Sequence, residues 1–566
     1  MDRLHTLRIF LVIGLFALFC RLFYLQGLRG SYYRGLAEQN RMRVVPDPPP
    51  RGLILDRRGR VLAANRTVYR IAVIPQEVED LDLILNRVSE LVGEPADKLR
   101  ARLKKEQTLV FMPATIVPDA PKQAALELEE ERWRLPGLLI RPEPIRHYPL
   151  GRTAAHLLGY LSQPKPDQLP LLKRYGIRPR TLIGRTGLEE LLDPVLRGEA
   201  GGRMVEVNHR GRQVRLVADQ KARPGEPVTL TIDAALQSLV EDAFGASAGA
   251  AVVLDPETGA VLAMASSPGY SPETFVRADS DELNLLFKDP ENIKPLVNRA
   301  TLATYPPGSI AKLVVGAAAL EAGVITAETT FECHGGLQIG DRLIHCWNHD
   351  GHGPVDLPHA LMHSCNVYFM HVGLRLGKAR LLDAYSRTGF GRPTEWPLPE
   401  RKGNLPQKRL TEGEVAMFAF GQTVFECTPL QAAIMAASFA NGGALVQPWV
   451  IQKVGSRQMK PPPMRGMVGW SKETLEHIRE GMHLVVQDPE GTGRRAKTTR
   501  VTVAGKTGTA QTHKPGQNHA WFAGFCPEEH PRAAIAVIAE FGGSGGDLPT
   551  EIGRTICEYV ALPETL

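Results

Sequence analysis

The feature that most constrains this 566-residue chain is an apolar run close to its N-terminus. Ile9 to Cys20 form an uninterrupted apolar segment, and Leu22 to Leu25 extend it past Arg21. A charged side chain near one end of a span can snorkel to the membrane surface, which leaves a usable stretch of about 17 residues. The run therefore predicts that this part of the chain lies in a membrane.

A cleaved signal peptide is the alternative interpretation of this run. Arg3 and Arg8 in front of a short apolar core would suit a signal peptide. However, no small residues mark a cleavage site behind the run, and Phe19 is too bulky for a good lipoprotein site before Cys20. We therefore expect a retained single-pass anchor at residues 9–25.

Length and composition set the expected domain organisation outside the anchor. A chain of 566 residues is too long for one hydrophobic core, and its 43% hydrophobic and 23% charged residues indicate folded domains. The net charge of +6 is mild and the basic residues are scattered, which argues against nucleic acid as a partner. The predicted parts are a cytoplasmic tail (1–8), the transmembrane anchor (9–25), a linker (26–50), a mixed α+β pedestal (51–221) and a C-terminal domain (222–566).

The C-terminal part has the pattern of an antiparallel sheet with helices on its faces, so the fold class is multidomain α+β. Asp233 is a predicted helix N-cap, and Asp255 to Gly259 are typical of a hairpin turn. Helices are expected at 233–244, 309–322 and 551–561, a hairpin at 249–266, and strands at 227–232, 501–509, 520–525 and 533–541.

Ser309 and Lys312 lie three residues apart at the start of an expected helix. Residues i and i+3 share a helix face, so the Lys312 amine can reach the Ser309 hydroxyl and, if burial keeps the amine neutral, take its proton. The same Ser-x-x-Lys spacing occurs at Ser162 and Lys165, where Pro164 excludes a regular helix. Spacing alone is therefore weak evidence for a nucleophile.

Two further motifs follow in the chain. Ser364-Cys365-Asn366 could pass a proton to a leaving nitrogen and orient Lys312, or it could be only a polar helix cap. Lys506-Thr507-Gly508-Thr509 lies on an expected strand, where the glycine lets a ligand backbone approach and the lysine and threonines can hold a carboxylate. The alternative for this third motif is an edge strand with a solubilising lysine. The three motifs in this order are the strongest functional signal in the chain.

Together the motifs resemble the signature of β-lactamases and penicillin-binding proteins. In the N-terminal half, Asp56-Arg-Arg-Gly59 and Arg146-His-Tyr-Pro149 are similar to the non-catalytic pedestal of class B penicillin-binding proteins. Tyr305-Pro-Pro-Gly-Ser309 and Ser364-Cys-Asn-Val-Tyr-Phe369 look most like penicillin-binding protein 2, the transpeptidase of cell elongation. The resemblance implies a pedestal of the dimerisation type followed by a β-lactamase-like transpeptidase domain.

The resemblance also implies a role for each motif residue in crosslinking peptidoglycan stem peptides, with β-lactams as competitors. Ser309 would be the acylated nucleophile, Lys312 its base and Ser364 the proton relay. Lys506 and Thr507 would hold the terminal carboxylate of a D-Ala-D-Ala stem, and no cofactor would be needed for this chemistry. The expected catalytic residues are Ser309, Lys312, Ser364, Asn366 and Lys506, and the expected substrate-binding residues are Thr507, Gly508 and Thr509.

Three of the seven cysteines cluster near these motifs together with one histidine. A Cys3His set is a complete tetrahedral group of zinc ligands, although the spacing is wider than in a zinc finger. Some penicillin-binding protein 2 members resemble this chain in having a zinc site there, which implies a structural zinc ion. A Cys333–Cys346 disulfide is the alternative in an oxidising compartment. The expected ligands are Cys333, Cys346, His352 and Cys365, with His334, His345 and His349 as additional candidates.

The resemblance further implies a location and protein partners. The expected arrangement is a single pass through the inner (cytoplasmic) membrane with the catalytic domain in the periplasm. A RodA-type glycosyltransferase and an MreC-type scaffold are the expected protein partners. The nearest alternative is the division-specific paralogue, which shares all three motifs. A hydrolytic β-lactamase or D,D-carboxypeptidase needs no long N-terminal region, and a non-enzymatic β-lactam sensor would be indicated if Ser309 failed to react with penicillin.

Overall fold

The chain forms two compact units that interleave along the sequence. The first unit contains Met1–Gly52, Asn65–Arg146 and Arg197–Gly225, and the second contains Leu53–Ala64, His147–Leu196 and Glu226–Leu566. Residues 53–64 and 147–196, which the sequence pattern placed in the pedestal, belong to the second unit because their apolar side chains join its hydrophobic core. This computed structural model describes residues 2–107, 112–165, 181–208, 213–278, 280–422, 425–512 and 517–562.

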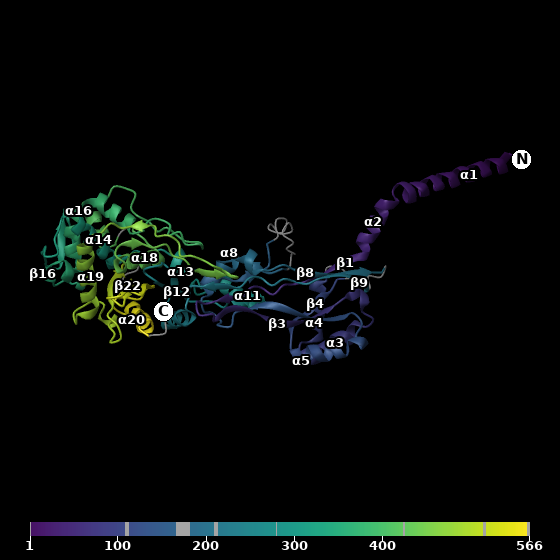
Figure 1. Cartoon of the computed structure of the whole chain (residues 1–566), viewed down its shortest axis with the longest axis horizontal. Helices are drawn as coiled ribbons and strands as arrows, with labels where there is room; N and C mark the ends of the chain where they lie inside the picture. Colours follow the sequence, from purple (N-terminus) through teal and green to yellow (C-terminus); the bar gives the residue numbers. More distant parts are fainter. Residues whose placement is uncertain are drawn as a thin grey trace. The chain divides into compact units, whose positions relative to one another are not determined.

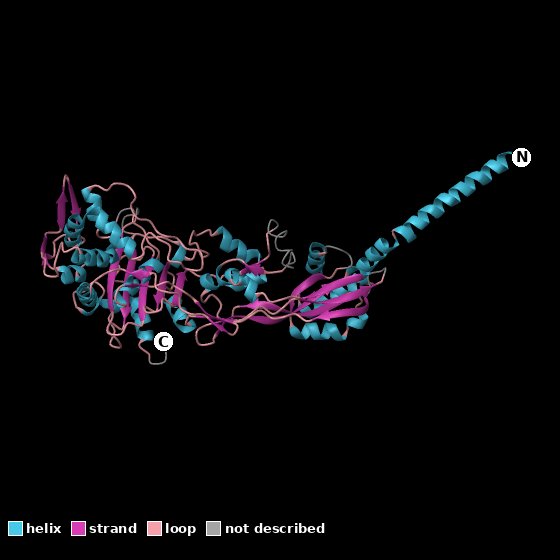
Figure 2. Ribbon diagram, turned by 45° about the horizontal axis from the view of Figure 1, so that its top comes forward, coloured by secondary structure: helices cyan, strands magenta, loops and turns pink. Residues whose placement is uncertain are grey.

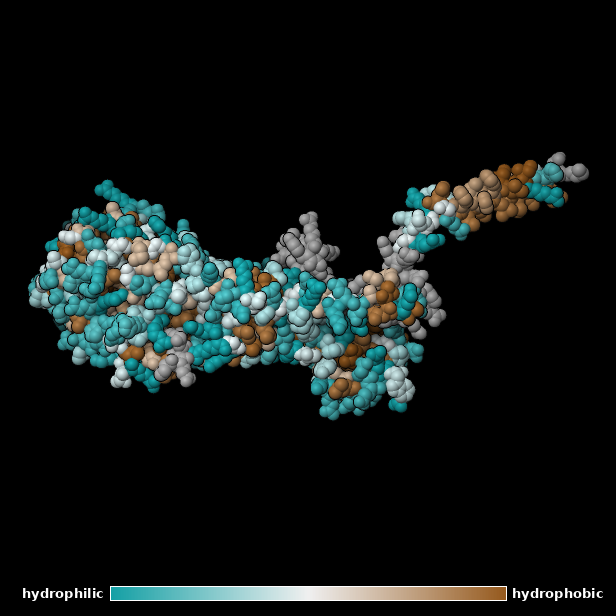
Figure 3. All heavy atoms as spheres, viewed as in Figure 1, coloured by the Kyte–Doolittle hydropathy of each residue, from teal (hydrophilic) through white to brown (hydrophobic). Residues whose placement is uncertain are grey.

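A long apolar helix begins the chain. Helix α1 (Asp2–Phe23) covers most of the predicted anchor and continues into a π-helical turn, η1 (Tyr24–Leu28). Residues Leu4–Leu28 are long and apolar enough to cross a membrane, and none of the most apolar window is buried in the structure. Figure 3 shows this helix as a continuous hydrophobic surface. Its side chains are therefore available to lipid.

The first unit combines two groups of paired strands with α1 and the helices named below (Figure 1). The helical segment at 81–106 is divided in two because Gly93, at φ +77°, ends the first helix and Pro95 precedes the second. Strand β3 begins in the second unit and ends in the first. The elements are α2 (Gly30–Arg41), β1 (Met42–Asp47), β3 (Val61–Val73), η2 (Pro75–Glu77), α3 (Leu81–Val92), α4 (Ala96–Glu106), β4 (Ala114–Ala120), α5 (Lys122–Glu130), η3 (Arg132–Arg134), β5 (Leu138–His147), β8 (Gly201–Val207) and β9 (Gln213–Gln220).

The second unit is built on a five-stranded antiparallel sheet of order β12-β11-β23-β22-β21 (Figure 2). Its strands are β11 (Gly249–Leu254), β12 (Val261–Ser267), β21 (Ala504–Ala510), β22 (His519–Cys526) and β23 (Ala533–Ala539). Side chains alternate between the two faces of a strand. Accordingly, Ala251 and Val253 of β11 pack with α10 (Ala234–Ala243) and α20 (Leu548–Val560), whereas Val252 packs in the core that contains α18 (Pro429–Ala440). The predicted antiparallel sheet with helices on both faces is confirmed.

The functional segments lie on elements that pack around this sheet. The nucleophile motif is on η4 (Gly308–Ile310) and α14 (Ala311–Glu321), and the second motif opens α16 (Asn366–Arg387). The remaining elements of this unit are β2 (Ile54–Leu55), α6 (Ala155–Leu158), β6 (Leu161–Ser162), β7 (Ile183–Gly184), α8 (Gly187–Leu191), α9 (Asp193–Leu196), β10 (Val228–Leu230), α11 (Pro272–Arg277), α12 (Ser280–Lys288), α13 (Arg299–Leu302), β13 (Phe331–Cys333), β14 (Gly336–Ile339), β15 (Arg342–His345), β16 (Gly353–Val355), α15 (Leu357–Met362), α17 (Glu412–Phe418), β17 (Ala444–Leu445), β18 (Ile451–Val454), β19 (Arg457–Gln458), β20 (Gly466–Met467), α19 (Lys472–Gln487) and η5 (Arg494–Ala496).

Candidate active site

Ser309 lies half-buried in η4, a 3-10 helix of one turn that leads into α14. Two glycines bring this turn close to its neighbours. Gly308 has a φ of +55°, and a Cβ atom there would lie 2.7 Å from the Thr509 carbonyl oxygen on β21. A Cβ atom at Gly421 would lie 2.1 Å from the Gly308 carbonyl oxygen. The nucleophile turn therefore packs against β21 at a distance that only glycine allows.

The second motif lies at the end of the Lys312 side chain, which is fully buried. Lys312 Nζ donates to Asn366 Oδ1 at 2.7 Å and to the Ser364 carbonyl oxygen at 2.8 Å, and it lies 3.3 Å from Ser364 Oγ. The N-cap of α16 is Cys365, whose Sγ accepts a hydrogen bond from the Tyr368 N–H. Ser364 and Asn366 are therefore not merely cap residues, because both contact the predicted base.

The third motif occupies β21, which is the edge strand of the five-stranded sheet. Lys506 is nevertheless fully buried, and its Nζ donates to the Thr507 carbonyl oxygen at 3.0 Å, so this lysine is not a solubilising one. Thr507 Oγ1 donates to Thr492 Oγ1 at 2.8 Å. A Cβ atom at Gly508 would lie 3.0 Å from the Pro307 carbonyl oxygen. Gly508 therefore allows close contact with the segment 305–309 that carries Ser309, the nucleophile loop. The approach of a ligand backbone at Gly508 stays a prediction.

Burial of the two lysines determines the electrostatics of the site. Burial lowers the pKa of Lys312 to about 8, and negative charge on the nearby Cys346, Cys365 and Cys333 thiols acts in the opposite direction. Burial also lowers the pKa of Lys506 well below its usual value, and the charge of Lys312 lowers it further. A lysine with a pKa near 8 is partly neutral at physiological pH, so the Lys312 amine can accept a proton.

A buried network anchors the nucleophile loop and was not identified from sequence. Tyr305 Oη donates to Glu540 Oε1 at 2.6 Å, and Arg299 Nε donates to the same oxygen at 3.0 Å. On the same loop the Pro306 carbonyl oxygen accepts a hydrogen bond of 2.9 Å from Trp521 Nε1. Glu540 follows β23 and is separated from Tyr305 by 235 residues, so no local motif could have indicated this pairing.

The four predicted metal ligands lie together beside the second motif. One ligand atom from each residue lies within 4.8 Å of all the others. His352 Nδ1 is 3.5 Å from Cys333 Sγ and 3.7 Å from Cys346 Sγ. These distances agree with the separation of about 3.6 Å between a sulfur and a nitrogen ligand of a tetrahedral zinc ion. All seven cysteines are free thiols, so Cys333 and Cys346 form no disulfide. Among the described residues, His334, His345 and His349 do not belong to the group.

The donor chemistry of this Cys/His cluster also suits a metal. A hydrogen bond from the Cys365 thiol lowers the pKa of Cys346, and the contacts with His352 and with the Asn366 N–H lower it further. A thiolate is the form of cysteine that binds zinc. The residues present therefore fit a tetrahedral zinc ion.

Known proteins are similar to this chain in both sequence and fold. Residues 249–558 match the family described as penicillin binding protein transpeptidase domain, and residues 46–230 match the penicillin-binding protein dimerisation domain. The peptidoglycan D,D-transpeptidase MrdA of Haemophilus influenzae is 31% identical over 96% of this chain and 89% of its own length.

Two solved structures extend this similarity to three dimensions. Penicillin-binding protein 2 of Helicobacter pylori, solved in complex with MreC, has a TM-score of 0.79 at 27% identity and covers 92% of this chain and 99% of that one. A peptidoglycan synthase complex that coordinates polymerisation and crosslinking contains a chain with a TM-score of 0.74 at 30% identity, covering 98% and 97% of the two chains. This chain therefore belongs to the class B penicillin-binding proteins, and within them to the penicillin-binding protein 2 type.

The lowered pKa of Lys312 predicts how acylation depends on pH. With the neutral Lys312 amine as the predicted base, the rate at which a fluorescent penicillin acylates the protein should rise with pH up to about 8 and level off above it. A stopped-flow series from pH 6 to 9.5 measures this profile. Lys312→Arg keeps the charge but cannot lose a proton, so it should lower the rate by about 10²- to 10⁴-fold at every pH. A flat profile for the unmodified protein would contradict the assignment of Lys312 as base.

The anchoring of the nucleophile loop predicts an effect of Tyr305→Phe. This change removes the hydrogen bond to Glu540 and leaves the Arg299–Glu540 ion pair in place, so the acylation rate should fall about tenfold through misplacement of Ser309. Tyr385→Phe is the matched control, because Tyr385 is also buried and donates to a carbonyl oxygen, that of Phe418, at 3.0 Å. Both variants should lose about 1 kcal/mol of stability. Equal acylation rates in the two variants would rule out a positioning role for Tyr305.

Proposed function

We propose that this protein crosslinks peptidoglycan stem peptides during cell elongation through an acyl-enzyme on Ser309. The observation that carries this proposal is the position of the buried Lys312 amine. It lies on the helix that follows the nucleophile and is hydrogen-bonded to Asn366 and Ser364 of the second motif. The chain is also 31% identical to a protein named peptidoglycan D,D-transpeptidase.

The first half of the reaction forms the acyl-enzyme. Ser309 Oγ attacks the carbonyl carbon of the D-Ala-D-Ala peptide bond while its proton moves to the neutral Lys312 amine. The N–H groups of Ser309 and Thr509 stabilise the oxyanion of the tetrahedral intermediate. The C–N bond then breaks, and Ser364 passes the proton from Lys312 to the leaving D-Ala nitrogen. Lys506 and Thr507 hold the terminal carboxylate of the donor stem.

The second half transfers the acyl group to another stem peptide. An amine of a neighbouring stem attacks the Ser309 ester, and its proton returns through the same relay to Ser309 Oγ. Asn366 positions the donor stem beside Lys312. β-Lactams acylate the same serine because they present a strained amide with a carboxylate in the corresponding place.

The location and partners of the protein follow from the same proposal. Peptidoglycan lies outside the cytoplasmic membrane, so the catalytic unit faces the periplasm and α1 crosses the inner membrane once. MreC is the partner of the similar protein from Helicobacter pylori, and polymerisation accompanies crosslinking in the similar synthase complex. An MreC-type scaffold and a RodA-type glycosyltransferase are therefore the partners that we propose for this chain.

A structural zinc ion is the cofactor that we propose for the Cys/His cluster. Cys333, Cys346, His352 and Cys365 would hold it, and the separations of their ligand atoms support this. When bound, zinc crosslinks the segments that carry its four ligands and takes no part in proton transfer. The chemistry at Ser309 needs no cofactor.

Penicillin labelling tests the proposed nucleophile. Fluorescent penicillin should label the purified protein covalently, and mass mapping should place the adduct on the peptide that contains Ser309. Ser309→Ala should abolish labelling because the adduct is an ester of that hydroxyl. The chance match of the motif provides the control, since Ser162→Ala should label normally. An adduct on any other residue would refute the mechanism.

Metal analysis tests the proposed zinc. The purified protein should contain about one zinc per chain, and Cys346→Ser should lose it. The free energy of unfolding of this variant should be lower by about 4 kcal/mol when free zinc exceeds its Kd for the unmodified protein 1,000-fold. Cys427→Ser, at another buried cysteine outside the cluster, should keep its zinc. Purified protein without zinc and with two of the four ligand residues oxidised would end the proposal.

A further inference from the structure

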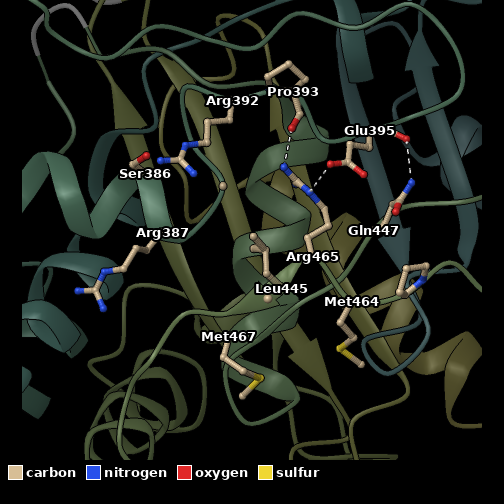
Figure 4. A pocket seen from close by; sticks show the side chains of 13 residues that line it. Ser386, Arg387, Arg392, Pro393, Glu395, Leu445, Gln447, Met464, Arg465 and Met467 are labelled. Atoms are coloured by element: carbon tan, nitrogen blue, oxygen red, sulfur yellow. Dashed lines mark hydrogen bonds and ion pairs between the residues drawn. The ribbon is translucent and has the colours of Figure 1, made fainter.

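A cavity of about 710 Å³ opens on the second unit, and none of the predicted active-site residues lines it. Figure 4 shows the side chains that surround it. They come from the end of α16, the following loop at 389–395, β17 and the segment 463–467 that includes β20. The volume lies in the range of about 300–1,000 Å³ that is usual for small-ligand sites.

A buried guanidinium forms the centre of this cavity (Figure 4). Only 11% of the Arg465 side chain is exposed, and its Nη2 donates to the Pro393 carbonyl oxygen at 2.6 Å. Nε and Nη1 are buried without a hydrogen-bond partner among the described residues. The Glu395 carboxylate lies 3.8 Å from Nε, which is too far for a hydrogen bond. A buried N–H group without an acceptor is unfavourable, so Arg465 has hydrogen-bond donors that the described residues do not satisfy.

The charges around Arg465 favour an anion. Arg392 is exposed at the rim and has no side-chain hydrogen bond or ion pair with any described residue. Arg387 also lines the cavity, but its guanidinium is held by Asp383 at 2.9 Å and by the Val468 carbonyl oxygen at 2.9 Å. Glu395 is the single acidic residue of the lining. Arg392 therefore supplies positive charge that no described residue neutralises, whereas Arg465 shares its charge with the Glu395 carboxylate 3.8 Å away.

Part of the remaining wall is apolar, and Ser386 and Gln447 add polar side chains to it. Leu445 forms part of it, and Met464 and Met467 are 49% and 66% exposed. Methionine side chains adapt their shape to irregular apolar groups. A ligand of this cavity therefore combines a carboxylate with small apolar groups beside it.

We propose that this cavity binds a stem peptide of peptidoglycan other than the one that reacts at Ser309. A stem peptide carries carboxylates next to alanine methyl groups, which matches the two arginines and the methionine and leucine wall. Guanidinium groups form strong charge-assisted hydrogen bonds with carboxylates. This assignment rests on the proposed function, because a transpeptidase works on a polymer in which further stem peptides surround the reacting one.

Binding to protein whose catalytic site is closed tests the proposal. Full-length protein in detergent is first acylated at Ser309 with penicillin, and a soluble disaccharide tetrapeptide is then titrated by calorimetry. Saturable binding at one site per chain is expected, with a Kd that rises about tenfold in Arg392→Gln through loss of one charge-assisted hydrogen bond. Arg465→Met should show the same direction of change, and Arg457→Gln, at an exposed arginine on β19, should bind as the unmodified protein does.

Two results would overturn the assignment. One is the absence of saturable binding, or an unchanged Kd in both Arg392→Gln and Arg465→Met. The other is equally tight binding of an acetylated Asp/Glu tetrapeptide of L-amino acids, which would make the cavity a docking site for acidic protein segments. Penicillin labelling of Ser309 should be normal in all three arginine variants. Loss of labelling would concern the proposed function, whereas loss of peptide binding in labelled protein concerns the cavity.

Discussion

The burial of two lysines in one site is the constraint on which the rest of the catalytic unit depends. Lys312 and Lys506 are both fully inaccessible to solvent, and the charge of one lowers the pKa of the other. Compared with an ordinary lysine, a pKa of about 8 corresponds to a free-energy cost of about 3 kcal/mol for the charged form of Lys312. This electrostatic cost favours the neutral amine, which is the form that the proposed role of Lys312 as a base requires. The Ser364 carbonyl oxygen and the Asn366 amide oxygen accept hydrogen bonds from that amine and fix its position.

Close backbone contact follows from the same constraint. Water is excluded from the lysines only if η4 packs tightly on β21, and glycines make that packing sterically allowed. At Gly308, Gly421 and Gly508 an added Cβ atom would meet a carbonyl oxygen at 3.0 Å or less. The glycine of the third motif is thus required by packing, whether or not substrate approaches there as the sequence predicts. The Tyr305–Glu540–Arg299 network adds a second anchor on the other side of Ser309.

Sequence patterns predicted local structure and motifs well because those signals are local. The Asp233 cap, the hairpin at 249–266 and the C-terminal strands all have the expected form, and Ser162 lies on the short strand β6 rather than on a helix. Patterns were uninformative where burial depends on distant partners. The apolar residues of 53–64 and 147–196 gave no sign of which core they join. The carboxylate of Glu540 was equally uninformative, because its partners are far away in the chain.

The Cys/His cluster matters to the chemistry because of the backbone at Ser364. Ser364 has a φ of +53°, a left-handed conformation that costs a residue with a side chain about 1–2 kcal/mol. The next residue, Cys365, belongs to the cluster, and the Asn366 N–H donates to Cys346 Sγ at 3.4 Å. A zinc ion bound there would fix Cys365 directly, and it would fix Asn366 through the hydrogen bond to Cys346. The strained backbone presents the Ser364 carbonyl oxygen and hydroxyl to Lys312, so a structural metal would stabilise the geometry of proton transfer without contacting a reacting atom.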